Sequence, residues 1–222
     1  MYLLAFDTSL NRTYISLGRD EQILGSQIVE SKEGIYHSEF LTEKIKEILD
    51  DNSLKITDID AVITNVGPGS FTGIRTCNTV ARMLGQQLDV DVVGVSSLEI
   101  LSSLNDSEKA SLCLMDARKH KAYAAIYSRS EEILPPSALD IDDTIKKASD
   151  NKYFIVADTK ISSILKEHGI EALNYEETNY DLGRNLLKLG YEHLKRGGNF
   201  NFALLKPLYI QPPSITMPKP KN

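Results

Sequence analysis

The sequence predicts an α/β protein built from two related lobes. Its 222 residues, 41% of them hydrophobic, are enough for two small domains that bury a real core. Short apolar runs typical of strands alternate with segments of helical periodicity, which is the pattern of a layered α/β fold. A hairpin-like pattern in which Asp precedes Tyr by seven positions occurs twice, beginning at Asp7 and at Asp116. This repetition predicts a duplicated fold.

The first half reads as a hairpin followed by alternating helices and strands. Turn residues separate two apolar or β-branched runs near the start, and apolar positions at three- and four-residue spacing mark two helices. In chain order we expect a strand at 3–6, a turn at 7–11, a strand at 13–17, a helix at 38–51, a strand at 61–66, a helix at 72–88 and a strand at 90–95. The second helix should turn Ile74, Cys77, Ala81, Leu84 and Leu88 inward.

The second half repeats this order more faintly. We expect strands at 112–115, 122–127 and 153–157, and helices at 161–167 and about 182–196. Five of the eight prolines follow the last helix, so the end of the chain should be extended and edge-like. We place the lobes at 1–105 and 106–222, with the boundary within 102–109 and the last helix able to pack back on the first lobe.

The composition excludes several protein classes. The chain carries 25 basic and 31 acidic residues, a net charge of −6, whereas a free-standing nucleic-acid-binding domain is usually basic. The apolar runs are far shorter than the ~18 residues of a membrane span, and no basic leader precedes the first of them. Neither Cys77 nor Cys113 lies at metal-ligand spacing from another thiol or a histidine. We therefore expect a cytoplasmic protein with reduced thiols and no membrane anchor.

Two segments carry the chemistry of a binding site. Asp7, Thr8 and Ser9 follow the first strand and could hold a hydrated cation or a phosphate, although they are also ordinary turn residues. The segment 67–75, Gly-Pro-Gly-Ser-Phe-Thr-Gly-Ile-Arg, puts glycines and capping hydroxyls before a helix, as a phosphate loop does. It lacks the spacing of a Walker or dinucleotide-binding loop, so a tight strand-to-helix turn explains it equally well. The candidate residues of this glycine loop are Gly67, Pro68, Gly69, Ser70, Thr72, Gly73 and Arg75.

The sequence gives little support for a metal site or for a catalytic nucleophile. The four histidines form no pair at the spacing of a metallopeptidase site. No G-x-S-x-G motif surrounds Ser70, so a hydrolase triad gains no support. The sequence predicts no metal site.

Taken together, the motifs of the chain resemble those of the TsaB (YeaZ) family. The resemblance runs through the whole chain in order and rests on Asp7-Thr8-Ser9, His37-Ser38, the loop 67–75 with its Phe71 and Arg75, Ser96-Ser97-Leu98-Glu99, Asp116-Ala117-Arg118 and Pro207-Leu208-Tyr209. It implies the two-lobed, ribonuclease-H-like fold of actin, sugar kinases and Hsp70. It also implies a non-catalytic subunit that pairs with a TsaD-like transferase, which makes threonylcarbamoyladenosine beside the anticodon of tRNAs reading codons that begin with A.

The resemblance further implies where the partners bind. No cofactor is expected on this chain, with ATP and a metal ion on partner subunits. A TsaE-like ATPase and tRNA would be reached through the complex, and the chain alone would form a weak homodimer. The family pairs through the two helices of the first lobe, so we expect an interface of Phe40, Leu41, Ile45, Ile48, Thr76, Thr79, Met83 and Gln86. The family often has glycine where this chain has Cys77, Thr79 and Met83, which predicts a looser or differently angled contact.

Two observations from the residues bear on this role. The second half has no glycine loop with which to grip a nucleotide, which favours a non-catalytic chain. The segment 30–60 is strongly acidic and would suit a basic partner. A kinase or ATPase of the same fold stays open, with Asp7 or Asp116 as its catalytic carboxylate, and a peptidase is a weaker alternative.

Overall fold

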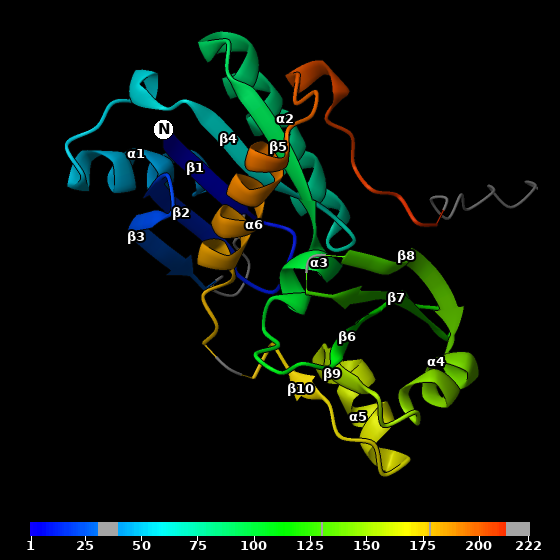
Figure 1. The fold of residues 1–222 in the computed structure, drawn as a ribbon. Helices are drawn as coiled ribbons and strands as arrows, with labels where there is room; N and C mark the ends of the chain where they lie inside the picture. The colour runs from blue at the N-terminus through cyan, green and yellow to red at the C-terminus, as the bar shows by residue number, and fades with distance from the viewer. Residues whose placement is uncertain (31–39, 130, 178, 212–222) are drawn as a thin grey trace, which may run out of the picture.

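The computed structural model describes residues 1–30, 40–129, 131–177 and 179–211, and it contains two lobes, each built on a five-stranded sheet (Figure 1). The first sheet has the order β3-β2-β1-β4-β5 and consists of β1 (Tyr2–Asp7), β2 (Thr13–Arg19), β3 (Gln22–Val29), β4 (Ala61–Gly67) and β5 (Asp91–Ser96). The second has the order β10-β9-β6-β7-β8 and consists of β6 (Ala110–Asp116), β7 (Lys121–Ser128), β8 (Glu131–Asp140), β9 (Tyr153–Ala157) and β10 (Leu173–Asn174).

Both sheets follow one plan. β1 is antiparallel to β2 and parallel to β4, and β6 is likewise antiparallel to β7 and parallel to β9. The predicted two-lobed, duplicated α/β fold is therefore confirmed. The two hairpins differ in register, since Asp7 lies opposite Tyr14 whereas Asp116 lies opposite Ala122. The equal Asp-to-Tyr spacing does not reflect equal pairing, because the connection between β6 and β7 is the shorter one.

The helices form layers outside and between the sheets. In chain order they are α1 (Leu41–Asp51), α2 (Phe71–Leu88), α3 (Ser97–Ser102), α4 (Ile141–Ala148), α5 (Thr159–Glu167) and α6 (Leu182–Arg196), with single 3₁₀ turns at Ile56–Asp58 and Phe202–Leu204. α1 and α2 cover the outer face of the first sheet, and α4 and α5 cover the outer face of the second. α3 and α6 lie between the sheets, where one shared core joins both lobes.

Successive side chains along a strand point to opposite faces of the sheet, and this alternation creates the cores. In β6, Leu112 and Leu114 point into the outer core of the second lobe, while Cys113 and Met115 point into the shared core. α6 packs against β1, β2 and β4, so the last helix of the chain completes the inner layer of the first lobe, as the ribbon shows (Figure 1). The positions of the lobes relative to each other are thus set by buried apolar contacts.

Sequence periodicity located most of the elements. The strands expected at 3–6, 13–17, 61–66, 90–95, 112–115, 122–127 and 153–157 are present, as are the four helices. The first of these helices begins at Leu41, and the part of the prediction at 38–39 lies outside the described residues. β3, β8, β10, α3 and α4 were not predicted. β3 and β8 are edge strands with half-exposed residues, so they lack the clear alternation of a buried strand.

The end of the described chain runs along the edge of the first sheet. The amide of Val92 donates to the carbonyl of Phe200 at 2.8 Å, and the amide of Leu208 donates to the carbonyl of Val66 at 2.8 Å. This segment brings Tyr209 to the glycine loop. Among the described residues, no helix combines the length and apolar character that crossing a membrane requires.

Candidate functional site

The glycine loop packs directly on the turn between β1 and β2. The Ser70 amide donates to the Ser9 carbonyl at 2.8 Å, and the Thr8 hydroxyl donates to the Gly73 carbonyl at 3.0 Å. A Cβ at Gly73 would lie 2.0 Å from the Thr8 carbonyl oxygen, so only glycine allows this approach. The Ser70 hydroxyl caps α2 by accepting from the Gly73 amide at 3.3 Å. Two loop amides that could have gripped a phosphate are therefore already bonded within the protein.

The turn residues themselves are buried. Asp7, Thr8 and Ser9 are 2%, 1% and 3% exposed, and none of them lines either of the two hollows described below. One carboxylate oxygen of Asp7 accepts from the amide and the hydroxyl of Ser9, at 2.7 and 2.6 Å. Burial raises the pKa of Asp7 despite these bonds. Asp7 thus lacks the access to a substrate that a catalytic carboxylate needs.

The matching position of the second lobe carries two carboxylates. Asp158 caps α5 by accepting from the Ile161 amide at 2.8 Å, and Glu176 accepts from the Thr159 amide at 3.0 Å. Asp116, the other candidate carboxylate, pairs with Lys160 at 2.9 Å. The positive end of the α5 dipole is therefore occupied by negative groups of the protein, which would repel a phosphate.

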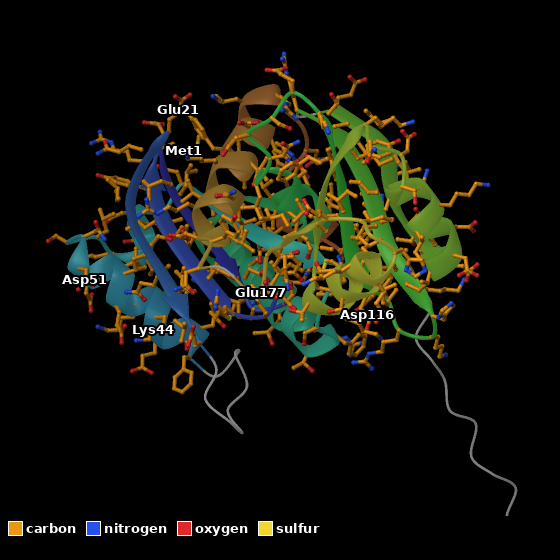
Figure 2. All side chains as sticks on the ribbon, turned by 90° about the horizontal axis from the view of Figure 1, so that it is seen from below. Met1, Glu21, Lys44, Asp51, Asp116 and Glu177 are labelled. Carbon is orange, nitrogen blue, oxygen red and sulfur yellow. The ribbon has the colours of Figure 1, made fainter. Side chains whose placement is uncertain are left out.

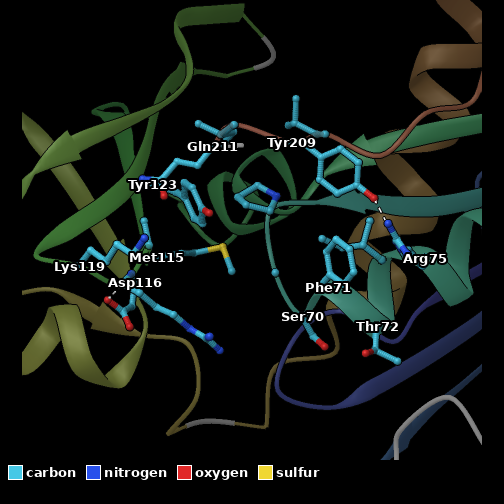
Figure 3. Close-up of a pocket in the computed structure, with 17 residues that line it drawn as sticks. Ser70, Phe71, Thr72, Arg75, Met115, Asp116, Lys119, Tyr123, Tyr209 and Gln211 are labelled. Carbon is cyan, nitrogen blue, oxygen red and sulfur yellow. Dashed lines mark hydrogen bonds between the residues drawn. The ribbon is translucent and has the colours of Figure 1, made fainter. Parts of the chain in front are cut away.

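A cleft of about 680 Å³ separates the glycine loop from the β6–β7 turn. One wall is aromatic: the rings of Phe71 and Tyr209 lie 6.0 Å apart, and the Arg75 guanidinium lies 4.0 Å from the centre of the Phe71 ring. Arg75 Nε also donates to the Tyr209 hydroxyl at 3.4 Å. Met115, Lys119 and Tyr123 face this wall across the cleft (Figure 3).

A second hollow, the α1–α2 groove, has a volume of about 340 Å³. Its lining residues are Thr42, Ile45, Lys46, Leu49, Asp50, Leu54, Lys55, Ile56, Val80, Met83 and Leu84. Met83 is 55% exposed at its edge. The other residues expected to face outward from α2 are accessible: Thr79 and Gln86 are exposed, and Thr76 is half-buried.

The structure corrects part of the expected interface. Leu41 and Ile48 are 1% and 2% exposed because they pack into the outer core of the first lobe, so they are wrong as surface residues. Ile45 is only 6% exposed, although it lines the groove. Phe40 is half-buried. Cys77 is fully buried and accepts from the Thr8 amide at 3.2 Å, so it cannot alter the angle of a partner helix.

Sequence reasoning did not assemble the cleft. The sequence analysis named Tyr209 only within the motif Pro207-Leu208-Tyr209. It did not assign Arg118, Lys119 or Tyr123 to a site with the glycine loop. The run Arg118-Lys119-His120-Lys121 was the available signal, since a basic turn at a strand end is a plausible anion contact. Among the residues that the structure describes, no group of three or more His, Cys, Asp or Glu side chains could hold a metal ion. The His37-Ser38 motif lies outside the described residues.

Comparisons of the sequence and of the fold with known proteins point to the same group of proteins. Residues 23–190 match the family described as TsaD, tRNA N6-adenosine threonylcarbamoyltransferase. The chain is 28% identical to the tRNA threonylcarbamoyladenosine biosynthesis protein TsaB of Bacillus subtilis over 66% of this chain and 65% of that protein. The Escherichia coli TsaB protein is 28% identical over 59% of this chain and 57% of its own length. The alignments thus span less than two thirds of these curated relatives.

The fold agrees over almost the whole chain. The structure of YeaZ from Pseudomonas aeruginosa superposes with a TM-score of 0.76, at 22% identity, over 94% of this chain and 99% of that one. The family match covers most of the chain and includes both lobes. This chain therefore belongs to the TsaD family, and within it the chain is similar to TsaB proteins.

Proposed function

We propose that this chain is a non-catalytic, TsaB-type subunit that binds a TsaD-like transferase in the pathway to threonylcarbamoyladenosine in tRNA. The names of its relatives, which are TsaB proteins of that pathway, support the role. The observation that carries the proposal is the α1–α2 groove with Met83 exposed beside it. An apolar groove of this kind suits an amphipathic helix of a partner protein.

The groove has the features of a contact surface. Apolar side chains of α1, α2 and the turn after α1 line it, together with the charged residues Lys46, Asp50 and Lys55. On α1, Lys44 pairs with Glu47 at 2.6 Å and Lys46 pairs with Asp50. Glu43 and Asp51 have no ion-pair partner among the described residues. These acids favour a partner with basic groups around an apolar centre. Thr79 and Gln86 would then extend the contact along α2.

Groups of the protein itself already bond the amides at the N-termini of α2 and α5, which supports a non-catalytic role. A phosphoryl-transfer enzyme of a two-lobed fold needs to hold the phosphates of a nucleotide by exposed amides and metal ions. Here Ser9 and the Ser70 hydroxyl satisfy amides of the glycine loop, and Asp158 and Glu176 satisfy those of α5. The kinase or ATPase alternative gains no comparable observation, and a calorimetric titration with Mg-ATP followed by a hydrolysis assay tests it directly.

The other partners and ligands in the proposed role follow from the pairing of this chain with the TsaD-like transferase. ATP and a metal ion would be held by partner subunits, and a TsaE-like ATPase and tRNA would be reached through the complex. In the absence of the transferase, a second copy of the chain would cover the same groove as a weak homodimer, because one self-complementary patch suffices for a two-fold contact. The transferase should displace that second copy.

The experiment is size-exclusion chromatography with light scattering of the Met83→Glu variant. A carboxylate that becomes buried without a partner in the contact costs enough to weaken association with the TsaD-like subunit by more than about tenfold. The homodimer should dissociate as well. Asn151→Glu is the matched control, because it adds the same charge to an exposed position of the second lobe, outside the groove, and should leave association unchanged. Association of Met83→Glu at the parent's strength would place the interface elsewhere.

A further inference from the structure

The C-terminal ends of α1 and α2 lie at one end of the first lobe. α1 leads into β4 and α2 leads into β5, and these two strands are parallel neighbours with Ala61 opposite Asp91. Both helices therefore end at the same edge of the sheet, as the ribbon shows (Figure 1). The α1–α2 groove reaches this edge, because Asp50, Lys55 and Ile56 line it. A segment that fills the groove therefore passes close to both helix ends.

This end of the first lobe is acidic. Its aspartates are all exposed, namely Asp50, Asp51, Asp58, Asp60, Asp89 and Asp91. Asp50 pairs with Lys46, and among the described residues the other aspartates of this set have no ion-pair partner. Lys55 is the single basic residue within 50–60 and 89–91. Negative charge gathered in this way attracts a basic segment of another protein and repels an acidic one.

The acidic residues of α1 lie where they destabilise the helix. The C-terminal end of a helix carries a partial negative charge, which basic residues in the last turn normally compensate. α4, α5 and α6 each have basic residues in the last turn, whereas α1 has none and ends with Asp50 and Asp51. A local conflict of this kind lowers the stability of the free chain, so it is expected at a contact surface.

The end of α2 shows the same conflict. Asp89 caps the helix in the left-handed region, with φ 56° and ψ 47°, and its amide donates to the Gly85 carbonyl. Glycine or asparagine usually occupies this position, because most side chains destabilise the left-handed conformation. The carboxylate of Asp89 adds repulsion from the negative end of the helix dipole. Both helices that border the groove thus end in uncompensated negative charge.

From these observations we infer that the segment which fills the α1–α2 groove is an amphipathic helix with arginine or lysine at one end, and that this basic end lies over Asp51 and Asp89. The apolar face of the helix contacts Met83 and the groove, and its basic end removes the repulsion at the ends of α1 and α2. The inference rests on the proposed function, since the TsaD-like transferase supplies the helix, and it adds the direction in which that helix lies. Seen from below, Asp51 lies on the far side of the molecule from Asp116, so this contact is remote from the interlobe cleft (Figure 2).

The test is a calorimetric titration of the TsaD-like subunit with charge-reversed variants of the full chain. At about 50 mM salt, where surface charges are weakly screened, Asp51→Lys and Asp89→Lys should each weaken association about fivefold, because attraction becomes repulsion. The double variant should weaken it by more than about tenfold, since contacts at two separate helix ends are nearly additive. At about 500 mM salt each single difference should fall below about twofold, because exposed ion pairs are screened.

Glu167→Lys is the matched control. Glu167 is the exposed last residue of α5 in the second lobe, so its reversal changes the net charge equally and at the same position of a helix. Asp51→Lys and Glu167→Lys should both raise the Tm of the free chain, because each replaces an acid at a helix C-terminus by a base. Only Asp51→Lys should weaken association. Weaker binding by a variant with a raised Tm excludes loss of folding as the cause.

The behaviour of Met83→Glu separates this inference from the proposed function. If Met83→Glu weakens association while folded Asp51→Lys and Asp89→Lys bind like the parent or like Glu167→Lys, this inference is overturned and the proposed function stands. If only the two aspartate variants weaken association, the basic segment binds outside the groove and the inference is overturned as well. If the parent does not bind the TsaD-like subunit, or if none of the three variants weakens binding, both proposals are overturned.

Discussion

Replacing Gly73 by alanine tests the contact between the glycine loop and the β1–β2 turn. Gly73 lies in the first turn of α2, where alanine would normally stabilise a helix by about 1 kcal/mol. Here the new Cβ would lie 2.0 Å from the Thr8 carbonyl oxygen and 2.7 Å from the Ser9 Cα. Both atoms belong to backbone that β1 and β2 hold in place. We therefore expect a loss of stability where helix propensity alone predicts a gain.

The size of the loss follows from the contacts that separate. Moving α2 away from the turn breaks the bonds from Thr8 to Gly73 and from Ser70 to Ser9, at 3.0 and 2.8 Å, each contributing about 1 kcal/mol. Residual overpacking adds about 1–2 kcal/mol. After the gain of about 1 kcal/mol in helix propensity is subtracted, the net destabilisation is about 2–3 kcal/mol, which lowers the Tm of a chain of this size by about 4–12 °C.

The assay is thermal unfolding by calorimetry, together with urea unfolding to compare m values. Thr79→Ala is the matched control, because this exposed position of α2 gains only helix propensity and should raise stability by a few tenths of a kcal/mol. A Tm of Gly73→Ala equal to or above that of the parent would refute the argument. It would mean that the turn can move away from α2 without losing stability.

Three further predictions concern ionisable side chains. Asp7→Asn should gain stability relative to the parent as pH rises above 3.8. Because burial raises the pKa of Asp7 in the folded protein, its carboxyl ionises first in the unfolded chain, and the parent loses stability as pH rises. A difference in Tm between the two proteins that is the same at pH 4 and pH 7 would contradict this. Burial raises the pKa of Cys77 to about 12 and that of Cys113 further, so a thiol reagent at pH 8 should label neither cysteine in the folded protein and both in denaturant. Glu176→Gln should destabilise the protein by about 0.5–1 kcal/mol in urea unfolding, since it weakens the charged cap on the Thr159 amide; unchanged stability would indicate that the cap does not stabilise α5.

The elements that the sequence located are those with strong local periodicity. α6 was expected at about 182–196 and spans Leu182–Arg196, because its apolar spacing and the glycines that follow are local signals. β8 was missed, since it is an edge strand, contains Pro135 and Pro136, and pairs with β7 through register shifts. An edge strand is stabilised by its neighbour more than by its own composition.

The sequence alone also indicated the duplicated α/β plan, the glycine loop and the outward residues of α2, because each depends on residues close together in the chain. Only the tertiary structure decided which surfaces are accessible. The apolar stripe of α1 was expected to be partly uncovered, yet Leu41 and Ile48 are buried in the outer core of the first lobe. The cleft joins Arg75 to Tyr209 across a separation of 134 residues. Periodicity can show that a helix has an apolar face, but burial of that face and contacts between distant segments depend on how the whole chain packs.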